Sequence, residues 1–203
     1  MKQPRALPLA AQSQFTNVIY VFIDASNLWE AQKAKRKFLD YERIGGYIKK
    51  RYNGTAVQIF FYTAYPADGT RKYALDKRHK FFTFLEKGLG FYVRKKVLKR
   101  ISALTDHGEV IKEKGNMDVE MTIDALHTIN QYNEAVFFTG DSDFLALITY
   151  LRNYGKKKVY IFSSKNNVAY ELRTGADEYV EILDVEEIWG KPLVRRTDLA
   201  KGE

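Results

Sequence analysis

The sequence of 203 residues contains no cysteine. This absence excludes disulfides, thiolate metal sites and a cysteine nucleophile, and it fits a reducing compartment. No apolar run approaches the roughly 20 residues of a membrane span. The first dozen residues lack the apolar core of a signal peptide. We therefore expect a soluble, cytoplasmic protein with no membrane association.

Several common catalytic motifs are also missing. There is no Walker A or G-x-G-x-x-G loop for nucleotide phosphates, and no G-x-S-x-G turn for a hydrolase serine. The histidines, His79, His107 and His127, lack the spacing of a zinc site. An aspartate phosphatase motif after the first apolar run fails because Ser26 stands at its second acidic position. These chemistries have no support in the sequence.

The chain is strongly basic, with 33 lysines and arginines against 25 acidic residues and a net charge of +8. Such a balance favours a polyanionic partner such as nucleic acid. Hydrophobic residues make up 45% of the sequence, which is enough to fill one core. Composition therefore indicates a globular domain with a polyanionic partner.

Short apolar runs alternate with helical segments along the chain. We predict strands over 18–23, 56–62, 135–138, 159–162 and 177–182. The apolar runs 18–23 and 135–138 are typical of strands buried on both faces of a sheet. Strands that alternate with helices indicate a parallel sheet covered on both faces. We therefore predict a single three-layer α/β/α domain with a central, mainly parallel sheet.

The predicted domain spans residues 15–185. Residues 1–14 are expected to form a mobile tail, and residues 186–203 a charged C-terminal tail. Alternation in 91–98 predicts an exposed or edge strand, followed by a loop over 99–108. Residues 109–112 are expected to pair back on that edge strand as a hairpin.

Two aspartates follow buried strands, Asp24 directly and Asp141 after a glycine turn. Neighbouring parallel strands lie about 4.8 Å apart, so these residues would share a crevice if the strands are neighbours. Asp118 begins a helix that leads into the second strand, and Asp143 follows Asp141 closely. Lysines could neutralise these acids, or the acids could hold Mg²⁺ or Mn²⁺, which prefer carboxylate oxygens.

In their order along the chain, four features resemble the NYN domain, of the bacterial LabA-like type, within the PIN-like nuclease superfamily. They are Asp24-Ala25-Ser26-Asn27, Lys114-Gly115 with Asp118, Asp124, and Thr139-Gly140-Asp141-Ser142-Asp143-Phe144. The resemblance covers residues 17 to 184. It implies a metal-dependent ribonuclease with a central parallel sheet, whose clustered acids bind Mg²⁺ or Mn²⁺.

By this resemblance the catalytic, metal-binding residues are Asp24, Asp118, Asp141 and Asp143. Asn27 would orient Asp24 or a metal-bound water. Ser142 would hold a carboxylate or a water, or only cap the helix. Asp124 lies six residues beyond Asp118 and cannot share its helix face. A structural salt bridge and a supporting role at the site both stay open for Asp124.

The expected reaction is hydrolysis of phosphodiester bonds in single-stranded RNA by water activated at the carboxylate-bound ion. Basic residues would contact this substrate: Lys114, Arg94, Lys95 and Lys96. One alternative is a catalytically weak or inactive RNA-binding or regulatory module, and another is a nuclease directed at DNA. A homodimer also stays open.

Overall fold

The computed structural model describes residues 16–67, 69–70, 76–105 and 108–193. Its centre is a sheet of six parallel strands in the order β4-β3-β1-β7-β8-β9. These strands are β1 (Val18–Asp24), β3 (Ala56–Tyr65), β4 (Tyr92–Val97), β7 (Glu134–Phe138), β8 (Lys158–Ser163) and β9 (Glu178–Glu181). The strands predicted over 18–23, 56–62, 135–138 and 159–162 occupy the interior of this sheet, and the predicted edge strand is β4.

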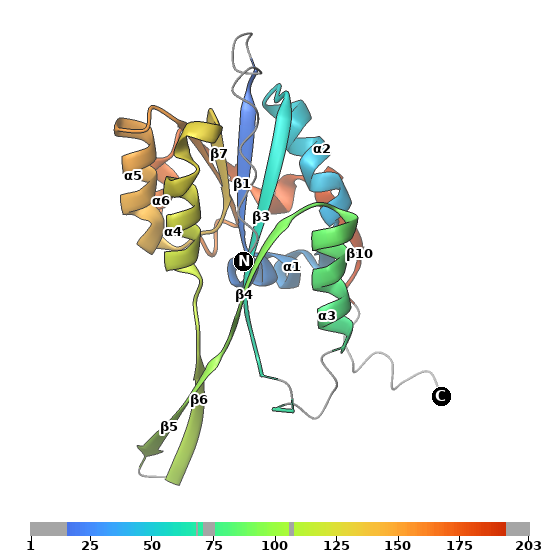
Figure 1. Cartoon of the computed structure of the whole chain (residues 1–203), viewed down its shortest axis with the longest axis vertical. Coiled ribbons are helices and arrows are strands. Elements are labelled where there is room, and N and C mark those ends of the chain that lie inside the picture. Colours follow the sequence, from blue (N-terminus) through green and yellow to red (C-terminus); the bar gives the residue numbers. More distant parts are fainter. Residues whose placement is uncertain (1–15, 68, 71–75, 106–107, 194–203) are drawn as a thin grey trace.

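Helices cover both faces of the sheet (Figure 1). One face carries α1 (Ala25–Lys35), α2 (Tyr41–Arg51) and α3 (Asp76–Thr83), which continues into the π-helical turn η2 (Phe84–Gly88). The other face carries α4 (Asp118–His127), α5 (Leu145–Asn153) and α6 (Tyr170–Gly175), with the short turn η3 (Ile129–Gln131) after α4. The predicted three-layer α/β/α architecture is confirmed.

The central strand β1 shows why the sequence folds into three layers. Ile19, Val21 and Ile23 face the core under α1 and α2. Tyr20 and Phe22, which alternate with them, face the core under α4 and α5. All five are at most 3% exposed, and full burial of each such side chain stabilises the fold by about 1.5–3 kcal/mol. A continuous apolar run therefore encodes a strand that helices must cover on both sides.

An antiparallel ribbon, β5 (Lys99–Thr105) and β6 (Gly108–Lys114), projects beyond the sheet (Figure 1). The predicted loop over 99–108 is therefore wrong in large part, and the hairpin partner of 109–112 is β5 instead of β4. The physical reason is that β5 lies outside the core, so no buried apolar pattern marks it as a strand. The strand is instead held in place by backbone hydrogen bonds to β6.

The C-terminal boundary predicted at residue 185 is also wrong. After η5 (Ile182–Asp184), residues 186–192 form η6 (Glu186–Ile188) and β10 (Trp189–Pro192), and β10 pairs antiparallel with β2 (Lys37–Leu39). Ile188 and Trp189 are 0% and 4% exposed, because they complete the core under α1 and α2. The sequence did not predict this burial, because charged residues surround these two side chains in the chain. The predicted N-terminal tail lies outside the described residues.

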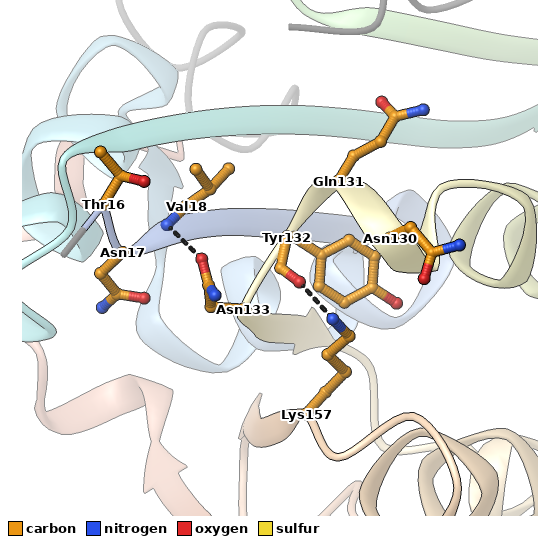
Figure 2. Close-up of a pocket in the computed structure, with 8 residues that line it drawn as sticks. All are labelled: Thr16, Asn17, Val18, Asn130, Gln131, Tyr132, Asn133 and Lys157. Carbon is orange, nitrogen blue, oxygen red and sulfur yellow. Dashed lines mark hydrogen bonds between the residues drawn. The ribbon is translucent and has the colours of Figure 1, made fainter. Parts of the chain in front are cut away.

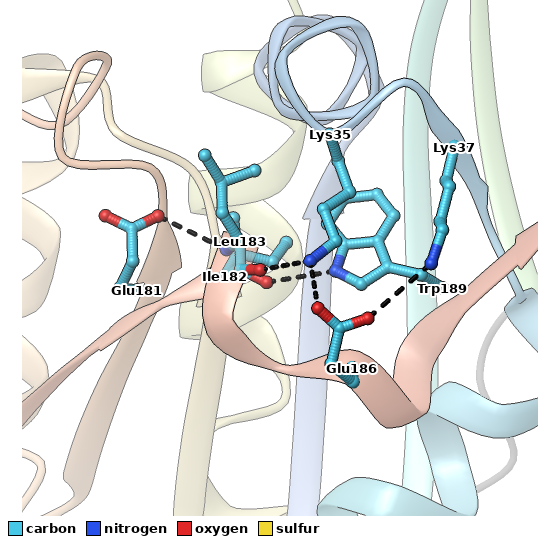
Figure 3. Close-up of polar contacts among 7 residues, drawn as sticks. All are labelled: Lys35, Lys37, Glu181, Ile182, Leu183, Glu186 and Trp189. Atoms are coloured by element: carbon cyan, nitrogen blue, oxygen red, sulfur yellow. Dashed lines mark hydrogen bonds and ion pairs between the residues drawn. The ribbon is translucent and has the colours of Figure 1, made fainter. Parts of the chain in front are cut away.

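Polar contacts fasten this last segment to the end of α1 (Figure 3). The indole N–H of Trp189 donates to the carbonyl of Ile182 at 3.2 Å. Lys35 donates to the carbonyl of Leu183 at 2.7 Å and forms an ion pair with Glu186. The chain beyond β9 is therefore held by both packing and charge.

Candidate metal centre

The strands that carry Asp24 and Asp141 are hydrogen-bonded neighbours, as the site prediction required. Their register pairs Ile23 of β1 with Phe138 of β7, so both strands end at the same edge of the sheet. Asp24 is the last residue of β1, and Asp141 follows β7 by three residues. Ligand sites of open parallel sheets lie at this carboxyl edge.

Three aspartates meet at this edge. Asp118, Asp141 and Asp143 each bring one carboxylate oxygen to a common point, and these oxygens lie within 4.8 Å of one another. Asp118 and Asp141 are half-buried, whereas Asp143 is exposed. Asp24 is outside this group, although its charge acts on Asp118. The structure thus gathers three of the four predicted ligands and leaves the fourth within electrostatic range. We call Asp118, Asp141 and Asp143 the acid cluster.

A 3-10 turn, η4 (Ser142–Phe144), positions two members of the acid cluster. Asp141 caps this turn, and its Oδ1 accepts a hydrogen bond from the backbone N–H of Asp143 at 3.0 Å. Phe144 is 1% exposed and anchors the turn in the core. Ser142, for which capping was one alternative, is exposed, and the capping oxygen comes from Asp141. Within the described residues Oδ2 of Asp141 accepts no hydrogen bond, so it stays open to a cation.

Asp118 is the first residue of α4 and follows Met117, which is buried in the core. The side-chain amide of Asn116 donates to its Oδ2. Burial raises the pKa of Asp118, and the negative charges of Asp141, Asp24 and Asp143 raise it further, while the Asn116 hydrogen bond opposes them. Burial is thus the main cause of the raised pKa, and the three neighbouring carboxylates add to it.

No lysine or arginine within residues 16–67, 69–70, 76–105 and 108–193 forms an ion pair with the acid cluster or with Asp24. The alternative in which lysines neutralise the acids is therefore not realised in this part of the chain. Like charges this close disfavour joint ionisation unless a cation joins them. A divalent ion such as Mg²⁺ takes few carboxylates together with water, which suits a half-exposed cluster.

Asn27 ties the end of β1 to the turn after β7. Its Nδ2 donates to Oδ2 of Asp24 at 3.1 Å, and its Oδ1 accepts from the backbone N–H of Gly140 at 3.0 Å. The same Oδ1 accepts from Nδ2 of Asn167 at 2.6 Å. Asp24 also caps α1, since its Oδ1 accepts from the backbone N–H of Ser26 at 2.9 Å and from its hydroxyl at 2.6 Å. Both oxygens of Asp24 therefore have partners within the protein.

Sequence reasoning missed the role of Asn167. Asn167 lies 140 residues from Asn27 in the chain, and no local spacing marks such a pair. Its backbone also crosses Gly140 closely: a Cβ on Gly140 would lie 2.1 Å from the carbonyl oxygen of Asn167. The glycine of the Thr139-Gly140-Asp141 turn is therefore required by close backbone approach.

Asp124 belongs to a separate, largely buried network. It forms two hydrogen bonds with the guanidinium of Arg94, at 2.8 and 3.0 Å, and accepts a third from the hydroxyl of Tyr62 at 3.0 Å. The side chains of Arg94 and Asp124 are only 14% and 13% exposed. The salt-bridge alternative for Asp124 is the one that the structure contains. Arg94, predicted to contact substrate, has its guanidinium engaged in this network.

The other basic residues predicted to contact substrate differ in how many interactions they already make within the protein. Lys96 donates to the carbonyl of Asn116 at 3.1 Å and pairs with Glu120 at 2.6 Å, so it braces the start of α4. Lys95 stands 5.5 Å from the centre of the Phe82 ring and 3.5 Å from Glu86. Lys114 ends β6, is exposed, and forms no ion pair with another described residue.

A polar cavity of about 550 Å³ lies away from the acid cluster, at the amino edge of the sheet. It is lined by residues 16–18 and 130–133 and by Lys157 (Figure 2). Lys157 donates to the carbonyl of Tyr132 at 2.6 Å, and burial lowers its pKa. Asn133 accepts from the backbone N–H of Val18 at 2.9 Å. These groups hold the starts of β1 and β7, and no acid is among the described residues that line the cavity.

A parallel α/β domain with an acid cluster at its carboxyl edge fits the class of PIN-like, metal-dependent nucleases. The family model of the NYN domain matches residues 18–184, and the chain belongs to this family. Low amplitude and bright protein LabA of Synechococcus elongatus (strain ATCC 33912 / PCC 7942 / FACHB-805) is 32% identical over 165 residues, which are 81% of this chain and 83% of that protein.

A solved structure supports the fold. The crystal structure of a protein of unknown function from Vibrio parahaemolyticus RIMD 2210633 matches with a TM-score of 0.67 and 23% sequence identity. The match covers 88% of this chain and 99% of that one. NYN domains in general are nuclease-like and bind nucleic acid, and the acid cluster could hold a metal ion. Among the described helices, none is long and apolar enough to cross a membrane.

Proposed function

We propose that this protein is a divalent-metal-dependent ribonuclease that hydrolyses phosphodiester bonds of single-stranded RNA. The observation that carries the proposal is the acid cluster: three carboxylate oxygens within 4.8 Å of one another, with no cationic partner among the described residues. A cluster of this kind is electrostatically unfavourable alone and becomes favourable around a hard cation.

The residues present fit such a cation. Asp118, Asp141 and Asp143 offer only oxygen ligands, which suit Mg²⁺ or Mn²⁺, and their partial exposure leaves room for water and a substrate phosphate. When bound, the ion supplies Lewis-acid stabilisation of the charge that develops on the phosphoryl group and makes bound water more acidic. The chain contains no cysteine, and we assign no side chain as nucleophile.

The remaining site residues hold the metal-binding groups in place. Asp24 and Asn27 fasten the end of β1 to the turn that carries Asp141, and so fix where this carboxylate points. Water supplies the oxygen that attacks phosphorus, and the bond between phosphorus and the 3′-oxygen breaks. One proton of the water goes to the leaving 3′-oxygen, so one product ends in a 3′-hydroxyl and the other in a 5′-phosphate. Lys114 lies four residues before Asp118, where its ammonium group can contact a phosphate of the RNA.

RNA is the proposed substrate because the chain belongs to a family of nucleic-acid-binding domains and carries a net charge of +8. A basic protein draws a polyanion towards its surface. A single strand suits this site, because its flexible backbone can bring one phosphate to the half-exposed acid cluster. The test must therefore include a matched DNA strand.

The experiment measures cleavage of a labelled single-stranded RNA with Mn²⁺, with Mg²⁺ and with EDTA. Asp141→Asn and Asp143→Asn should each lower the rate at least 100-fold, because each removes one charged ligand. Asp177→Asn is the matched control, since Asp177 pairs with Arg152 next to the start of β8, away from the acid cluster. Cleavage that survives EDTA or the Asp141→Asn substitution would refute the mechanism. Equal cleavage of DNA would reject RNA specificity.

A further inference from the structure

The ribbon formed by β5 and β6 divides its charges unequally between its two faces. Residues paired directly across an antiparallel ladder point to the same face, and so do residues two apart on one strand. The register pairs Lys99 with Lys114 and Ile101 with Lys112. Lys99, Ile101, Lys112 and Lys114 therefore share one face, which we call the lysine face. Arg100, paired with Glu113, lies on the other face.

The lysine face is electrostatically unfavourable in the free protein. Lys99 and Lys114 stand directly opposite each other, and like charges in this position destabilise a ladder. Lys112 is the diagonal neighbour of Lys99 across the ladder. All three side chains are exposed, and none pairs with an acid in the described parts of the chain. A local conflict of this kind is typical of a functional surface.

The root of the ribbon is fixed to the candidate metal centre. β4 runs into β5 through Leu98, whose backbone N–H donates to the carbonyl of Tyr65 at 2.8 Å. Across from it, a Cβ on Gly115 would lie 3.0 Å from the Leu98 side chain, so the two strands leave the domain in close contact. Lys96 bonds the carbonyl of Asn116 and pairs with Glu120 of α4. These contacts therefore fix the orientation of the ribbon relative to the acid cluster.

We propose that the lysine face binds the phosphate backbone of single-stranded RNA on its way to the acid cluster. The inference rests on the proposed ribonuclease function for its choice of polyanion. Three clustered ammonium groups match a chain of phosphates, and Ile101 offers apolar surface to a base. The exposed Val110 lies on the same face as Ile101 and adds to this apolar surface, whereas Ile111 lies on the other face.

The charge of the lysine face sets the expected salt dependence. Each phosphate neutralised on a single strand contributes about 0.7 to the slope of log K against log salt concentration. Three lysines therefore contribute about 2. Between about 50 and 200 mM salt, this slope corresponds to about a 20-fold loss of affinity that depends on the ribbon.

The test compares Lys99→Gln/Lys112→Gln/Lys114→Gln with the unmodified protein, by fluorescence anisotropy on a labelled RNA of about 20 nucleotides, longer than common single-strand sites. Binding is measured in EDTA over a salt series, so no cleavage occurs. The triple variant should lose about 2 from the slope. The control removes three exposed lysines elsewhere: Lys49→Gln/Lys50→Gln/Lys87→Gln. It should leave the slope within about 0.5 of the unmodified value.

Equal slopes for the ribbon variant and the unmodified protein would overturn the proposal, and so would equal losses in both triple variants. Thermal unfolding establishes that each variant is folded. The proposed function fails separately: a protein that binds RNA through the lysine face but does not cleave it with Mn²⁺ retains the ribbon assignment and loses the nuclease assignment.

Discussion

Asp118→Asn should stabilise the metal-free protein, although it removes a predicted metal ligand. At neutral pH the ionised Asp118 faces Asp141 and Asp143, with oxygens within 4.8 Å. Two unit charges at this distance repel by about 0.9 kcal/mol in bulk water. Screening over a Debye length of about 8 Å roughly halves this figure, so two pairs give about 1 kcal/mol. Asparagine keeps an acceptor oxygen for the Asn116 amide and loses the charge.

The corresponding rise in melting temperature is about 2–4 °C for a chain of this size, measured by scanning calorimetry in EDTA. Asp177→Asn supplies a control of opposite sign. Burial acts against ionisation of Asp177, but hydrogen bonds from Arg152 and from the backbone N–H of Val159 lower its pKa overall. Removing that charge should therefore lower the melting temperature. A lower melting temperature for Asp118→Asn in EDTA would contradict the electrostatic reasoning.

The pH dependence has a definite sign. The pKa of Asp118 is raised in the folded protein above its ordinary value of 3.8, so the folded state binds this proton more tightly than the unfolded state. The cost of ionisation is absent below the ordinary pKa and develops as pH rises through the folded pKa. Asp118→Asn should remove this decline from the metal-free stability curve. An unchanged curve would show that other groups cause it.

Four further outcomes are expected. Mn²⁺ at 100 times its dissociation constant should stabilise the unmodified protein by about 2.7 kcal/mol in calorimetry, and Asp118→Asn should lose most of this gain. Gly140→Ala should lower the free energy of unfolding by about 1–3 kcal/mol in urea titrations, because its Cβ would meet the Asn167 carbonyl; a neutral result would contradict that contact. Asp124→Asn should cost about 3 kcal/mol, since it leaves Arg94 poorly paired, with cleavage retained well below the melting temperature. Asn27→Ala should reduce cleavage about 10–100-fold while the far-ultraviolet circular dichroism stays unchanged.

The core of the fold could be predicted because strands that are buried on both faces need continuous apolar runs, which are visible in the sequence. β1 and β7 are apolar runs with both faces covered, and their carboxyl ends had to meet once the strands were neighbours. β5 could not be predicted in the same way, since cross-strand backbone bonds order it outside the core. Trp189 was missed because one buried aromatic in a charged segment carries no periodicity.

The acid cluster shows the same division at the level of side chains. Spacing indicated which aspartates reach the carboxyl edge, but it could not indicate where each carboxylate points. Asp24 uses both oxygens within the protein, on Ser26 and Asn27. Asp118 and Asp143 approach Asp141 through the geometry of the helix and turn that begin there. Hydrogen bonds of this kind depend on rotamers and distant backbone, which one-dimensional spacing does not encode.

The pairing of β10 with β2 has a practical consequence for anyone who expresses this domain. The family match ends at residue 184, and a gene truncated there would delete the Ile188 and Trp189 side chains that seal the hydrophobic interior beside α1. The shortened polypeptide would expose an apolar hole to solvent and aggregate on overproduction. Expression plasmids should therefore retain the coding sequence at least through Leu193, whose backbone N–H still bonds Arg36.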